Sequence, residues 1–172
     1  MSGPRVLVAV TGFVLAAAVS NVATSRLGVV DVGFGLAATA GTFTAGLALG
    51  CRDLIQRWGG RRASAGAIAL GSLLSLLVGA DGRIAVASFV AFLVSELVDM
   101  AVYTVAARRG HEAGVLVSNA AAAPLDTLVF LAVAGFPVTW PALAGQVLAK
   151  LVYATLVPLG LLAAVRRPVM AS

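Results

Sequence analysis

The amino-acid sequence predicts an all-α, polytopic membrane protein, and three observations support this fold class. The 172-residue chain is 60% hydrophobic and only 11% charged, whereas a soluble domain carries about 25% charged residues to cover its surface. The mean hydropathy is +1.03. The apolar residues also form long runs of the kind that a lipid bilayer solvates. The length suits a single integral-membrane domain over residues 1–172.

Six apolar segments approach the ~20 residues that a helix needs to cross the hydrocarbon core. The predicted helices span residues 6–24, 32–50, 64–80, 84–107, 113–134 and 141–165. The first segment also fits a signal peptide, because Arg5 precedes the apolar run and small residues follow near Ala23. We expect a retained helix there, since five further spans follow it.

The placement of basic residues predicts that the N and C termini are both cytoplasmic. The N-terminal tail, the second and fourth loops and the C-terminal tail hold most of the arginines: Arg5, Arg52, Arg57, Arg61, Arg62, Arg108, Arg109, Arg166 and Arg167. The first and third loops hold only Arg26 and Arg83. Cytoplasmic loops are enriched in Lys and Arg, and six spans return the chain to the side from which it started.

Several functional classes are disfavoured by the same composition. The net charge of +5 comes from short basic clusters between apolar blocks, which do not form a face for nucleic acid. Cys51 is the single cysteine and His111 the single histidine, so we expect no metal site and no cofactor. Asp99 and Asp126 lack the glycine-rich surroundings of an intramembrane aspartyl protease, and we expect no enzyme.

Polar and ionisable residues within the predicted spans indicate a binding site, because such groups cost several kcal/mol in a bilayer. Helical spacing places them on one stripe of each of the last three helices. The candidates for substrate binding are Phe92, Glu96, Asp99, Tyr103, Asn119, Asp126 and Lys150. Carboxylates outnumber Lys150 in this set, so the predicted cavity suits a donor-rich or cationic heterocycle, on which the aromatic rings would stack.

Other interpretations of these residues remain open. Asp126 and Lys150 are predicted either to bind a solute or to form a buried pair that fixes helix register. Arg52 and Asp53 either close the cytoplasmic mouth of the cavity or form a solvated helix end. The small residues Ala38, Thr42, Gly46 and Gly50 form a strip at four-residue spacing, which favours close packing within the bundle over a dimer face.

Three stretches resemble motifs of the vitamin uptake transporter family. Ala40-Gly41-Thr42 followed by Arg52-Asp53-Leu54-Ile55-Gln56 resembles its second helix. Ser95-Glu96-Leu97-Val98-Asp99 with Tyr103 resembles its most specific segment, in the fourth helix. Ser118-Asn119, Asp126-Thr127-Leu128-Val129-Phe130 and Lys150 resemble parts of the fifth and sixth helices.

The resemblance implies a six-helix carrier in the bacterial plasma (inner) membrane. The implied cargo is a small purine-like base, in particular the queuosine precursors 7-cyano- and 7-aminomethyl-7-deazaguanine. The implied site residues are Asp53, Glu96, Asp99, Asn119, Asp126 and Lys150. Two alternatives remain: a substrate-capture subunit of an energy-coupling-factor importer, and a membrane scaffold that transports nothing. Besides lipid, a coupling subunit or a second copy of the chain is a possible partner.

Overall fold

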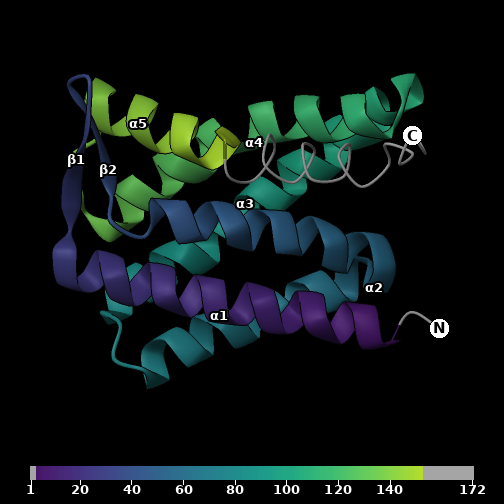
Figure 1. Ribbon diagram of the computed structural model, residues 1–172, viewed down its shortest axis with the longest axis horizontal. Coiled ribbons are helices and arrows are strands. Elements are labelled where there is room, and N and C mark those ends of the chain that lie inside the picture. Colours follow the sequence, from purple (N-terminus) through teal and green to yellow (C-terminus); the bar gives the residue numbers. More distant parts are fainter. Residues whose placement is uncertain (1–2, 153–172) are drawn as a thin grey trace, which may run out of the picture.

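The computed structural model describes residues 3–152 of the chain. Within them a long helix precedes a small antiparallel hairpin, and further helices follow (Figure 1). The elements are α1 (Gly3–Leu27), β1 (Val29–Gly33), β2 (Leu36–Thr39), α2 (Thr42–Leu77), α3 (Gly82–Ala106), the short 3₁₀ helix η1 (Ala107–Arg109), α4 (His111–Ala134) and α5 (Trp140–Leu151). The mostly helical fold agrees with the predicted class.

Three described helices are long and apolar enough to cross a membrane: Gly3–Leu27, Gly82–Ala106 and the Leu116–Ala134 part of α4. They coincide with the first, fourth and fifth predicted spans. The protein is therefore a membrane protein with several candidate spans. The full set of six spans and the side on which the termini lie remain predictions, and the end of the sixth predicted helix falls outside the described residues.

The helix predicted over residues 32–50 is wrong in its first part, because residues 29–39 form the β-hairpin. Val29 pairs with Thr39, and Val30 with Ala38. The turn residues Gly33, Phe34 and Gly35 all have positive φ, a conformation that favours hairpin turns and disfavours a helix. Asp31 Oδ1 accepts a hydrogen bond from Gly33 N at 2.6 Å. The hairpin was not predicted because its turn residues lie within a long apolar run. Ala38, which was predicted to belong to the small-residue strip of a helix, lies in β2.

The prediction that residues 52–62 form a loop is also wrong, because α2 continues through them. A single residue, Gly60, interrupts the helix with φ 77° and ψ −179°. The segment before Gly60 runs from Gly41, next to Ser20, to Gly59, next to Val6. The segment after it returns along α1, so that Gly71 lies against Phe13. Gly60 therefore joins two helices that both pack on α1, and the second of them replaces the predicted helix 64–80.

Two apolar clusters hold the helices together around the polar interior. Phe13 of α1, Ile55 and Ile68 of α2 and Phe92 of α3 belong to the first, and the rings of Phe13 and Phe92 are 5.4 Å apart. The second joins α3, α4 and α5 near the hairpin end: Ile84, Ala87, Ala91, Phe130, Leu131 and Ala142. In Figure 1, α1 and α2 lie side by side, and α5 lies beside the hairpin. The polar residues described below lie between these two apolar clusters.

Candidate functional site

Arg52 is at the centre of a buried charged cluster. It projects from the first half of α2, and only 1% of its side chain is exposed. Its guanidinium contacts Asp53 Oδ1 at 2.7 Å through Nη2 and at 3.2 Å through Nε. Nη1 lies 3.3 Å from Glu96 Oε2, and Nη2 lies 3.6 Å from Asp99 Oδ2. We call these four residues the Arg52 cluster.

The Arg52 cluster joins two groups that the sequence placed in separate roles. Glu96 and Asp99 were predicted as substrate ligands, and Arg52 and Asp53 as a gate or a solvated helix end. The nearly complete burial of Arg52 excludes the solvated helix end for that residue. The contact between Arg52 and the acids of α3 could have been predicted from chemistry. A buried arginine requires carboxylates, and the two acids on α3 are one turn apart.

The Arg52 cluster carries more negative than positive charge. One guanidinium faces three carboxylates, so full ionisation would leave an excess of two negative charges. Such an excess in a low-dielectric interior requires a proton or a nearby cation to balance it. The cluster is therefore suited to exchange a proton or to rearrange its ion pairs.

Asn119 of α4 adds a neutral group to this cluster, because its side chain forms a hydrogen bond with Asp53. Tyr103 is half-buried one turn beyond Asp99 on α3 and does not line either pocket described below. The structure thus brings Asn119 to the predicted acids and leaves Tyr103 at the edge of the site.

Asp126 of α4 and Lys150 of α5 form a second buried ion pair. Lys150 Nζ donates to Asp126 Oδ2 at 2.5 Å and to Thr127 Oγ1 at 3.1 Å. The two side chains are 6% and 4% exposed. The two residues thus form a buried pair, and the choice between a solute site and a pair that only fixes helix register stays open. Asp126 Oδ1 has no hydrogen-bond partner among the described residues, so the carboxylate retains a free acceptor.

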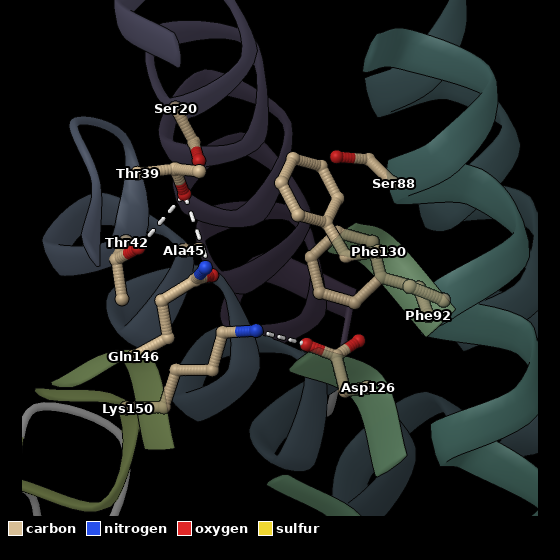
Figure 2. Close-up of a pocket in the computed structure, with 11 residues that line it drawn as sticks. Ser20, Thr39, Thr42, Ala45, Ser88, Phe92, Asp126, Phe130, Gln146 and Lys150 are labelled. Atoms are coloured by element: carbon tan, nitrogen blue, oxygen red, sulfur yellow. Dashed lines mark hydrogen bonds and ion pairs between the residues drawn. The ribbon is translucent and has the colours of Figure 1, made fainter. Parts of the chain in front are cut away.

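This ion pair forms a wall shared by two pockets. The first, the hairpin-side pocket, has about 300 Å³ of space between its lining atoms, a volume that includes space open to solvent. Its lining is Ser20, Thr39, Thr42, Ala45, Ser88, Ala91, Phe92, Asp126, Phe130, Gln146 and Lys150 (Figure 2). The second, the inner pocket, encloses about 260 Å³, with Leu49, Arg52, Ser95, Asn119, Ala122, Ala123, Asp126, Lys150 and Leu151 around it.

The pockets and the Arg52 cluster follow one another along the bundle. On α3 the order from the hairpin end is Ser88, Phe92, Glu96 and Asp99, and on α4, which runs in the opposite direction, it is Asp126 followed by Asn119. The Asp126–Lys150 pair separates the two pockets, and Arg52 separates the inner pocket from the carboxylates. Polar groups therefore form a column through the interior of the bundle.

Several groups in the hairpin-side pocket were not among the predicted site residues. Figure 2 shows Gln146 and Lys150 extending from α5 into the pocket, with the rings of Phe92 and Phe130 beside them. Ser20 and Thr39 are isolated hydroxyls in apolar sequence and gave no signal, whereas Thr42 belongs to the motif that resembles the family's second helix. Gln146 precedes Lys150 by one helical turn, so the sequence places it on the same polar stripe of the helix as Lys150.

Comparison with known proteins places the chain in a family. No curated protein and no solved structure matches it. Residues 74–163 match the family described as "putative vitamin uptake transporter". The match covers more than half of the chain, from the end of α2 onward. It includes Glu96, Asp99, Asn119, Asp126 and Lys150, and Arg52 and Asp53 precede it. The chain therefore belongs to the vitamin uptake transporter family.

Proposed function

We propose that this protein is a carrier that imports a small purine-like base across the bacterial plasma membrane. The observation that carries the proposal is the polar column: two pockets separated by one buried ion pair, followed by a second buried charged cluster. Buried ionisable groups in a membrane protein mark solute or ion pathways. Family membership adds that the solute is a small molecule.

The cargo class that we propose is the pair of queuosine precursors, 7-cyano- and 7-aminomethyl-7-deazaguanine. Both are flat and carry many hydrogen-bonding groups. The hairpin-side pocket offers flat rings from Phe92 and Phe130, and hydrogen-bonding groups from Asp126, Lys150 and Gln146. Stacking on aromatic rings with a few polar groups is a common way to bind such bases.

The two charged sites have different roles in this proposal. Phe92, Asp126 and Lys150 contact the solute in the hairpin-side pocket, and Asn119 contacts it in the inner pocket. Glu96 and Asp99 contact it later, after Arg52 has moved away from them. The ion pairs of Arg52 with these two acids, at 3.3 and 3.6 Å, are longer than the 2.7–2.9 Å of a tight charge-assisted bond. Alternating access requires pairs that exchange in this way.

The test is uptake of both labelled precursors into bacteria that lack queuosine synthesis and their own transporter. Glu96→Gln and Asp99→Asn keep the side-chain shape and remove the charge, so we expect uptake to fall at least about tenfold in each. Asp31→Asn is the matched control, because Asp31 is exposed in the hairpin and asparagine can still accept the bond from Gly33. Membrane expression of each variant is measured beside uptake.

The outcomes separate a carrier from a scaffold that transports nothing. Uptake by the wild type and the Asp31 variant, with loss in the two α3 variants, supports transport through the polar column. A well-expressed wild type without uptake of either precursor contradicts the cargo. Full uptake by Glu96→Gln and Asp99→Asn contradicts the role of the acids, because it would leave them as packing residues only.

A further inference from the structure

The hairpin-side pocket presents a balanced charge to an incoming solute. Among its described lining residues, Asp126 and Lys150 are the charged ones, and they neutralise each other. None of Asp53, Glu96 and Asp99 lines this pocket or the inner pocket. At the inner pocket the solute would meet the guanidinium of Arg52, which stands in front of these carboxylates. The hairpin-side pocket therefore offers a cation no carboxylate whose charge is uncompensated.

Gln146 supplies a free donor to the pocket. Its side chain is nearly completely buried, and Nε2 has no hydrogen-bond partner within residues 3–152. A short chain of hydroxyls orients the amide: Thr39 Oγ1 donates to Gln146 Oε1 at 3.4 Å, and Thr39 and Thr42 share a bond of 2.9 Å. A buried donor without a partner costs about 1–3 kcal/mol, which a ligand acceptor would recover.

Asp126 supplies a free acceptor to the same pocket. Oδ2 is engaged by Lys150, and Oδ1 has no partner among the described residues. Gln146 and Lys150 are four residues apart on α5, a rise of about 6 Å, and Lys150 holds the carboxylate beside it. Both residues line the hairpin-side pocket, which is therefore bordered by one donor and one acceptor that have no partner within the described part of the chain.

We propose that the hairpin-side pocket is the recognition site of the carrier and that it takes a neutral, planar heterocycle. The ring accepts a hydrogen bond from Gln146 Nε2, donates one to Asp126 Oδ1, and packs against the rings of Phe92 and Phe130. This inference rests on the proposed transport function and narrows it. It selects 7-cyano-7-deazaguanine over the 7-aminomethyl compound, because an ammonium group would be desolvated beside Lys150, and the charge of the carboxylate in the described lining is already neutralised by that lysine.

Equilibrium binding to the full chain, purified in lipid nanodiscs, tests the inference separately from uptake. The probes are 7-cyano-7-deazaguanine, 7-aminomethyl-7-deazaguanine, 7-deazahypoxanthine, which lacks the exocyclic amine, and the neutral rings hypoxanthine and nicotinamide. We expect the aminomethyl compound to bind at least about tenfold more weakly than the cyano compound, because its charge is not compensated. Gln146→Glu replaces the free donor with an acceptor of the same shape. We expect this change to weaken binding of the cyano compound at least about tenfold. The affinities for the aminomethyl and cyano compounds should then be closer to each other than in wild type.

Gln56→Glu is the matched control, because it is the same substitution at a residue that lines neither pocket. Thermal unfolding in the same nanodiscs shows whether each variant folds. The inference is overturned if the aminomethyl compound binds wild type as tightly as the cyano compound, if Gln146→Glu binds the cyano compound like wild type, or if no neutral ring binds. Gln146-dependent binding of another neutral ring, without binding of either precursor, would support the inference and contradict the proposed cargo.

Discussion

At the scale of single residues, Arg52 determines whether the buried acids are tolerated. One guanidinium serves three carboxylates from two helices, and its fork of donors allows contacts in several directions. Lysine, with a single charged nitrogen, cannot reproduce this arrangement. Replacing a well-made buried pair entirely is often neutral, but removing one partner leaves a charge buried and uncompensated. The stability of the bundle should therefore be more sensitive to Arg52 than to any one acid.

Arg52→Met tests this dependence. It keeps the apolar stem of the side chain but removes the guanidinium and its charge, so we expect a loss of about 3–5 kcal/mol from the free energy of unfolding. The measurement is thermal unfolding in nanodiscs, beside Arg61→Met, an exposed position in the second half of α2 that should change little. Adding Glu96→Gln and Asp99→Asn to Arg52→Met should restore part of the loss. If the triple variant is no more stable than Arg52→Met, unpaired carboxylates are not the cause.

At the scale of elements, the predicted α3 and α4 needed little correction, because each is an apolar run bounded by charges or glycine. The error at α2 has a physical origin. Sequence reasoning treated Arg52–Arg62 as solvated because charge in a bilayer is costly, but the acids of α3 compensate Arg52 in the interior. The connection between the two halves needed only the positive φ of Gly60. Neither a tertiary ion pair nor a one-residue turn is visible in composition.

Gly60→Ala tests the turn within α2. The combination of φ 77° and ψ −179° belongs to a region that is essentially restricted to glycine, and a residue with a Cβ pays about 1–3 kcal/mol there. No atom lies within 4 Å of the added Cβ, so the cost would come from the backbone. Gly66→Ala is the matched control: its Cβ also meets open space, but no positive φ is required. We expect thermal unfolding to shift downward in Gly60→Ala alone. Equal shifts would contradict backbone strain at Gly60.

At the scale of the whole molecule, the sequence indicated which kinds of residue form the site. It did not indicate how these residues are divided between the two pockets and the Arg52 cluster. The stripes on α3, α4 and α5 do converge, as the periodicity indicated, and Asp126 pairs with Lys150. The sequence did not reveal that the acids of α3 lie behind Arg52, or that hydroxyls of α1, β2 and α2 line the pocket. Those facts depend on how the hairpin packs beside α5 and how the two halves of α2 pack on α1.

The hairpin and the Gly60 turn lie at opposite ends of α1 (Figure 1), so one labelling experiment tests the predicted orientation. The charge bias places the Gly60 turn, with Arg61 and Arg62, in the cytoplasm, and the hairpin tip on the outer side. Phe34 at that tip is fully exposed. In a Cys51→Ser background, a membrane-impermeant maleimide added to intact spheroplasts should label Phe34→Cys. Arg61→Cys, which is also exposed, should be labelled only after permeabilisation. The reverse pattern would place the termini outside, and the hairpin-side pocket would then open toward the cytoplasm and act at release rather than at capture.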